Sequence, residues 1–77
     1  MDRVKLERFI KKLNAKNEIS FYLYNVKYII INKNKSFIIK NSGSSHIYSY
    51  EKLGELFKEY KVYGESLVEL FDDIIIN

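Results

Sequence analysis

The spacing of the apolar residues changes near residue 18, from the period of a helix to the period of a strand. Before this point Leu6, Phe9, Ile10 and Leu13 fall at positions that form one stripe along a helix. After it, residues 19–40 alternate with a period of two and are rich in β-branched and aromatic side chains. A chain that carries both patterns must pack a helix against a sheet, so we expect an α+β fold.

The first predicted helix has a clear start and end. Asp2 is the expected N-cap, because its carboxylate can accept hydrogen bonds from the first free N–H groups of the helix. Lys11 and Lys12 lie near the expected C-terminal end, where positive charge favours the helix dipole. The apolar period stops at residues 14–17, which we expect to form a turn.

The alternating segment divides into three strands joined by short polar connections, which favours an antiparallel meander of hairpins. In the first strand, Ile19, Phe21 and Leu23 are expected to face the helices, while Ser20 and Tyr22 point to the other side together with Tyr24. The predicted strands are residues 19–24, 27–32 and 36–40, and the connections are residues 25–26 and 32–35.

The C-terminal half is expected to hold two more helices after a Ser/Gly loop at residues 41–45. Ser49 is the expected N-cap of the first of these, and Gly64 is the expected turn before a helix of about two turns that begins at Glu65. Gly54 indicates close packing, because glycine costs about 1 kcal/mol relative to alanine inside a helix. The apolar stripes are Leu53, Leu56, Phe57 and Tyr60, and then Leu67, Leu70 and Phe71.

The predicted architecture is one two-layer α+β domain over residues 1–77, with the element order helix, three-stranded antiparallel meander, helix, helix. The isoleucines at 74–76 fit either a short edge strand or a frayed helix end. A chain of this size is close to the lower limit at which packing alone stabilises a fold.

The composition excludes several classes of site. The chain has no Cys and one His, His46, so neither a thiolate metal site nor a histidine cluster can form. We assign no catalytic residues, cofactor, metal or small-molecule substrate, and expect a protein that is not an enzyme. The longest apolar run, residues 28–31, is far shorter than the roughly 18 residues of a membrane span. Residues 1–13 also lack a signal core, so a soluble, cytoplasmic protein without a membrane partner is expected.

The charges are divided between the two halves of the chain. Residues 1–40 contain ten Lys or Arg and three acidic residues, whereas residues 41–77 contain three Lys and seven acidic residues. Such a bipolar chain can present a basic surface and an acidic surface to different partners. An acidic patch formed by Glu65, Glu69 and Asp72 on the third helix is one candidate site for a basic protein partner.

The second and third predicted strands are apolar on both faces, which exceeds what a sheet covered on one side can bury. We therefore expect an exposed platform that binds a host protein or a second copy of the chain, as in a homodimer. Tyr22 and Tyr24 would belong to this platform, together with one face of the second strand. That face is either Tyr28 and Ile30, which we place in the binding site, or Ile29 and Ile31.

Single-stranded nucleic acid or RNA is the alternative partner, because it requires aromatic rings for stacking and cations for phosphates. The basic first helix offers a second route to nucleic acid through Lys5, Arg8 and Lys12. The cations beside the tyrosine platform are Lys27, Lys33, Lys35 and Lys40.

Two resemblances accompany these patterns. The predicted order of elements resembles that of double-stranded-RNA-binding domains, but the second helix has Glu51 where that family has lysines. Residues 48–53 and 64–74, with the pattern Gly-x-Ser-Leu-x-Glu-hydrophobic-x-Asp, look like the C-terminal half of short uncharacterised proteins of phages and mobile elements of low-GC Gram-positive bacteria. This second resemblance implies an accessory protein that binds and inhibits a host protein, as anti-CRISPR proteins do.

Overall fold

Five strands form one antiparallel sheet in the order β4-β3-β2-β1-β7, and β5 and β6 form a separate hairpin. The computed structural model describes all of residues 1–77. The expected order of a helix, three antiparallel strands and two further helices is confirmed, and four short strands are added in the C-terminal half. The elements are α1 (Arg3–Lys16), β1 (Glu18–Leu23), β2 (Val26–Lys33), β3 (Ser36–Asn41), β4 (Tyr48–Tyr50), α2 (Leu53–Glu59), β5 (Lys61–Val62), β6 (Glu65–Ser66), α3 (Leu67–Leu70), the 3-10 turn η1 (Phe71–Asp73) and β7 (Ile75–Ile76).

Helix α1 begins where its sequence predicts and extends further than expected. Oδ1 of Asp2 accepts hydrogen bonds from the backbone N–H groups of Val4, at 3.0 Å, and Lys5, at 3.2 Å. The predicted turn at residues 14–17 is helical as far as Lys16, and Asn17 ends the helix with a left-handed φ of 59°. Asparagine tolerates this conformation better than most residues, which explains why the helix stops there.

Tight two-residue turns at residues 24–25 and 34–35 set the register of the meander. All four turn residues have φ between 52° and 64°, as in the type I′ turns that suit the twist of a hairpin. The first turn lies one residue earlier than the connection predicted at 25–26. As a result, Tyr22 lies opposite Lys27.

An edge strand takes the place of the predicted start of the second helix. Ser49, the expected N-cap, pairs with Ile38 across the β3–β4 ladder. The helix starts only at Leu53, after Lys52, which makes no side-chain capping bond. Gly54 is likewise not closely packed, because no atom lies within 4 Å of the position that a Cβ would occupy. The close packing predicted there is wrong.

The predicted third helix is a hairpin followed by a single helical turn. Ser66 is its N-cap, and the backbone N–H and hydroxyl of Ser66 both donate to Oε1 of Glu69, so α3 begins at Leu67 rather than at Glu65. At the end of the chain, Ile75 and Ile76 pair with β1 as β7, which selects the edge strand over the frayed helix end.

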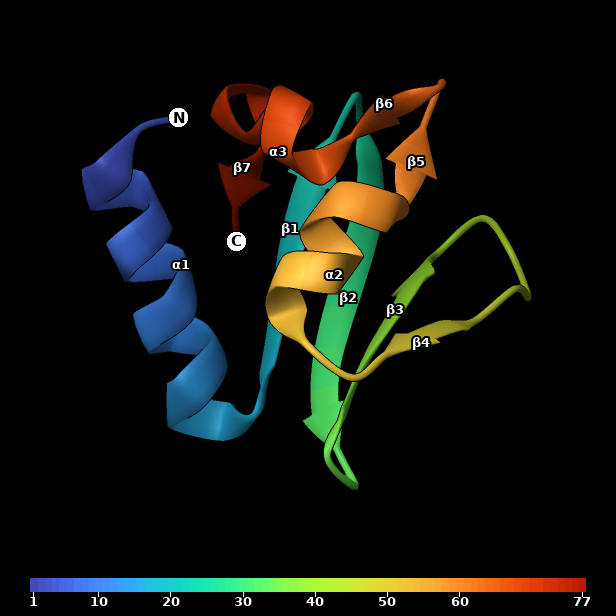
Figure 1. Cartoon of the computed structure of the whole chain (residues 1–77). Coiled ribbons are helices and arrows are strands. Elements are labelled where there is room, and N and C mark those ends of the chain that lie inside the picture. The colour runs from blue at the N-terminus through green and yellow to red at the C-terminus, as the bar shows by residue number, and fades with distance from the viewer.

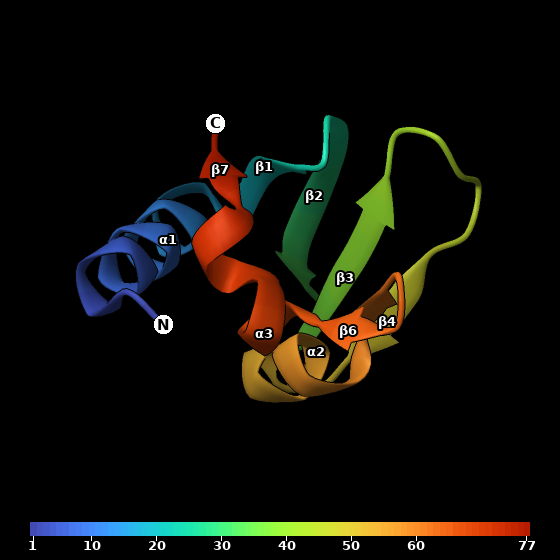
Figure 2. The same ribbon diagram turned by 90° about the horizontal axis from the view of Figure 1, so that it is seen from above.

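One face of the sheet and the three helices enclose the core. The ring of Phe9 lies within 6 Å, centroid to centroid, of the rings of Phe21, Phe57 and Phe71, so α1, β1, α2 and η1 meet around it. Figure 2 shows the helices gathered on one side of the sheet. Ile19, Phe21 and Leu23 lie on that side and are buried, as predicted. The opposite side has no helix against it.

Candidate functional site

The uncovered side of the sheet carries a patch of isoleucines at its centre. Ile31 lies directly opposite Ile38 on the neighbouring strand, and Ile29 is two residues along the same face of β2. These three side chains are half-buried although no helix covers them, and the more exposed Tyr22 lies beside them on β1. On a small protein, an apolar patch without a covering layer is a candidate interaction surface.

Lysines surround this patch. Lys27 lies opposite Tyr22, Lys40 lies opposite Ile29, and Lys33 ends β2 on the same face. The one carboxylate on this face belongs to Glu18, opposite Ile31. We call this surface the open sheet face, and it consists of Tyr22, Ile29, Ile31 and Ile38 with Lys27, Lys33 and Lys40.

The structure corrects the positions of three members of the predicted platform. Tyr28 and Ile30 are 5% and 0% exposed and belong to the core, so they cannot contact a partner together with Tyr22. Tyr24 is exposed, but it lies in the β1–β2 turn rather than on the sheet. The predicted hairpin already contained the signal for the correct face, because a two-residue connection at 24–25 or at 25–26 pairs Tyr22 with an odd-numbered residue.

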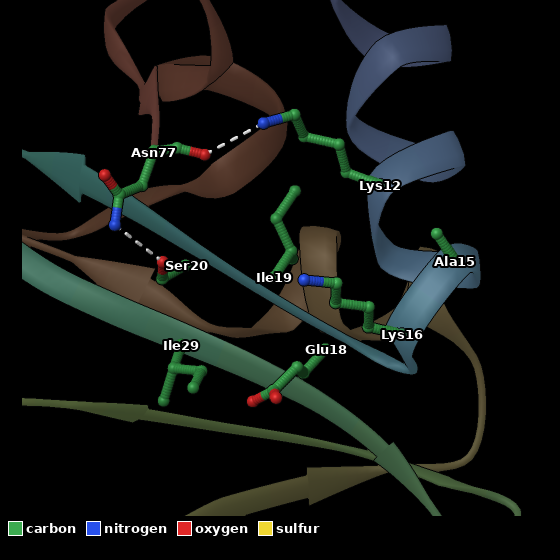
Figure 3. Close-up of a pocket in the computed structure, with 8 residues that line it drawn as sticks. All are labelled: Lys12, Ala15, Lys16, Glu18, Ile19, Ser20, Ile29 and Asn77. Atoms are coloured by element: carbon green, nitrogen blue, oxygen red, sulfur yellow. Dashed lines mark hydrogen bonds between the residues drawn. The ribbon is translucent and has the colours of Figure 1, made fainter.

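A groove of about 440 Å³ opens at one edge of the open sheet face, between α1, β1 and the last residue of the chain (Figure 3). Nζ of Lys12 donates to the backbone oxygen of Asn77 at 3.0 Å, and Nδ2 of Asn77 donates to Oγ of Ser20 at 3.0 Å. Ile29 and Ser20 line the groove and also lie on the uncovered side of the sheet, so the two surfaces are continuous. The lining residues are Lys12, Ala15, Lys16, Glu18, Ile19, Ser20, Ile29 and Asn77.

The sequence indicates Lys12 as a candidate cation, but it gives no sign of the groove. Its walls come from residues 12–20, from β2 and from residue 77, and only the tertiary structure brings these segments together. No local sequence pattern predicts a groove formed by segments that are distant in the sequence. The groove combines two lysines, Lys12 and Lys16, with apolar side chains and one carboxylate, that of Glu18.

The predicted acidic patch is partly used inside the protein. Glu69 accepts the hydrogen bonds of its capping box, and those from the Ser66 backbone and then the Ser66 hydroxyl lower the pKa of the Glu69 carboxyl. Oδ1 of Asp72 accepts a hydrogen bond of 3.0 Å from the backbone N–H of Asp2. Glu65, the third predicted residue, is exposed.

Of the lysines predicted beside the tyrosine platform, Lys27, Lys33 and Lys40 share the open sheet face. Lys5 donates to the backbone oxygens of Phe71 and Asp72 and so stabilises the C-terminal segment. Lys35 lies in the β2–β3 turn, two residues after Lys33. The remaining residues of the predicted basic helix are Arg8, which is exposed, and Lys12, which lines the groove.

No group of three or more His, Asp or Glu side chains is placed to hold a metal ion. His46 forms a local contact in its loop, with Nδ1 3.1 Å from Oγ of Ser44. None of the helices has the length and apolar content required to cross a membrane. Comparisons of the chain with protein-family models, with curated proteins and with solved structures find no match.

Proposed function

We propose that this protein is a non-enzymatic interaction module whose open sheet face binds an acidic and partly apolar surface of a protein partner. The observation that carries the proposal is the uncovered isoleucine patch of Ile29, Ile31 and Ile38 within a rim of lysines. Apolar side chains at the centre of an interface supply most of its binding free energy, and charges at the rim supply orientation and specificity.

The side chains of this face favour a protein over a nucleic acid. Stacking of bases requires aromatic rings, and Tyr22 is the one aromatic side chain on the open sheet face. Isoleucines have no π-face for a base, and the loss of Tyr28 to the core removes the second ring that stacking would use. Lysines alone would support only weak, salt-dependent contacts with phosphates.

The same charges disfavour a second copy as the occupant. In a two-fold dimer built on this face, Lys27, Lys33 and Lys40 of one copy would approach the same residues of the other copy. One carboxylate per copy, on Glu18, is available to offset them. The carboxylates of an acidic partner can instead pair with all three lysines of the open sheet face and with the lysines of the adjoining groove. We therefore propose a negatively charged partner.

The role that we propose for this contact is inhibition of a host protein by covering its surface, in the setting of a phage or mobile element. The support is the resemblance of residues 48–53 and 64–74 to small proteins of such elements. A test is expression in a low-GC Gram-positive bacterium with an active CRISPR system. Phage plaque formation should recover with the wild-type protein and not with a variant of the open sheet face.

The direct test is an NMR titration with a synthetic helical peptide that carries leucines on one side and glutamates on the other. We expect the amide signals of Ile29, Ile31 and Ile38 to shift at low salt. In an Ile31→Thr, Ile38→Thr variant, binding should weaken about tenfold, because part of the buried apolar area is lost while strand propensity is kept.

The matched control is a Val4→Thr, Ile47→Thr variant, which changes two exposed apolar residues outside the open sheet face. It should bind the peptide like the wild type. The proposal fails if both variants bind the peptide equally well. It also fails if a single-stranded RNA of similar charge shifts the same signals and binds with higher affinity than the peptide. Dimerisation that is lost in the Ile31→Thr, Ile38→Thr variant, measured by analytical ultracentrifugation, would identify a second copy as the occupant instead.

A further inference from the structure

We propose that Tyr24 and Tyr63 together form a docking site for an arginine side chain of a protein partner. The two residues lie in the β1–β2 and β5–β6 turns, which Figure 1 shows at the same end of the molecule. Their ring centroids are 5.9 Å apart and their planes are inclined at 45°. Tyr24 is 48% exposed and Tyr63 is 80% exposed, so much of both rings is open to solvent.

Both tyrosines occupy the same position in two turns of the same kind. Each is the first residue of a two-residue turn, with φ of 52°, and is followed by Asn25 or Gly64, also with positive φ. Asn, Asp and Gly are favoured at this first position, because a bulky residue is strained in the left-handed region. The turns themselves therefore do not require the rings, which indicates that the rings act outside the turns.

Carboxylates flank the pair. The hydroxyl of Tyr24 donates to Oδ2 of Asp73 at 3.4 Å, and Glu65 follows Tyr63 by two residues on β6. Desolvation, and then the negative charges of Asp73 and Glu65, raise the pKa of Tyr24. Aromatic faces beside carboxylates attract cations, since the ring quadrupole and the negative charges act in the same direction.

The geometry favours arginine over lysine. A guanidinium group is planar, so it can stack on a tyrosine ring while its N–H groups donate to a neighbouring carboxylate. Tyr63 offers the more exposed ring, and Asp73 offers the acceptor that already bonds to Tyr24. This site has the opposite charge to the open sheet face and does not depend on the function proposed for that face.

The experiment is an NMR titration of the full chain with a blocked tri-arginine peptide, and with its tri-citrulline counterpart as a neutral probe of the same shape. We expect tri-arginine to shift the ring signals of Tyr24 and Tyr63, and tri-citrulline to leave them unchanged. A Tyr63→Asn variant suits the turn and should fold, and its affinity for tri-arginine should fall about fivefold with the loss of one cation–π contact. Asp73→Asn should cause a similar fall.

A Tyr48→Asn variant is the matched control, because it removes an exposed tyrosine from β4, at the opposite edge of the sheet from β7. It should bind tri-arginine like the wild type. The inference is overturned if Tyr63→Asn also binds like the wild type, or if tri-arginine shifts signals only on the exposed side of α3. The acidic peptide used for the open sheet face reports on a different surface, so either proposal can fail while the other holds.

Discussion

The side chain of Lys5 contacts both the backbone oxygen and the aromatic ring of Phe71. Nζ of Lys5 donates to the carbonyl oxygen of Phe71 at 2.9 Å and lies 5.3 Å from the centroid of the Phe71 ring. A second hydrogen bond of 3.1 Å reaches the carbonyl oxygen of Asp72. One side chain of α1 thus satisfies two carbonyl groups of η1, a segment more than sixty residues away in the sequence.

We expect Lys5→Met to lower the free energy of unfolding by about 1–2 kcal/mol, because it leaves two carbonyl groups without their charged donor and removes the cation–π contact. Urea denaturation measures the change. Lys11→Met, an exposed substitution on the same helix, should stay within about 0.5 kcal/mol of the wild type. Equal effects of the two substitutions would show that the contact with Phe71 is not stabilising.

Adjacent residues of β3 should respond very differently to truncation. Ile39 is completely buried in the core, so Ile39→Ala should cost about 2–5 kcal/mol. Ile38 is half-buried on the open sheet face, and Ile38→Thr should cost less than about 1 kcal/mol, because threonine keeps the β-branched shape. Thermal unfolding of both variants tests which side of the sheet is covered, and the reverse order of stability would contradict the structure.

Glu69 should contribute a pH-dependent part of the stability. Its pKa in the folded protein is lowered by the Ser66 backbone N–H and hydroxyl, so folding favours the ionised form. This contribution is fully present above the ordinary pKa of 4.5 and is lost as the pH falls through the lowered value. In Glu69→Gln the contribution is absent, so the difference in stability between wild type and variant should shrink on acidification. A difference that grows below the ordinary pKa would contradict this capping role.

Tyr63→Asn should stabilise the protein, although it removes an aromatic contact. The substitution creates an Asn-Gly pair, which is strongly favoured in a type I′ turn, and it relieves the positive φ of a bulky residue. Because Tyr63 is largely exposed, the lost packing is small, and we expect a gain of about 0.5–1 kcal/mol. Differential scanning calorimetry measures it, and destabilisation would mean that the contact with Tyr24 outweighs the turn strain.

Gly54→Ala should also stabilise the protein. A methyl group at this position meets no atom, and alanine has the higher helix propensity, so the expected gain is up to about 1 kcal/mol. Gly54 lines an apolar groove of about 270 Å³ with Met1, Ile10 and Val68, so the methyl group would project towards solvent. A loss of stability in urea denaturation would show that α2 must change its packing to accept the side chain.

Much of the fold could be predicted because its signals are local. The helix α1, its cap at Asp2 and the alternation of β1 are all indicated by short segments, and the structure confirms them. Ser49 shows the limit of local signals. Serine is typical of a helix N-cap, whereas the tyrosines on either side of it are typical of a strand. Pairing with Ile38, a contact across a loop, decides between the two.

The candidate sites likewise depend partly on local signals in the sequence and partly on contacts between distant segments. The residues alone predict more apolar strand surface than one layer of helices can cover, and the basic residues are concentrated in the N-terminal half of the chain. Alternation within residues 28–31 does not select the exposed side of β2, because both sides are apolar, and only the short connection to the preceding strand indicates it. The contacts of Lys12 with Asn77 and of Tyr24 with Tyr63 join segments about forty to sixty-five residues apart, so they arise only from the packing of the whole chain. Periodicity fixes which residues share a face, whereas register and the packing of distant segments fix which face is covered.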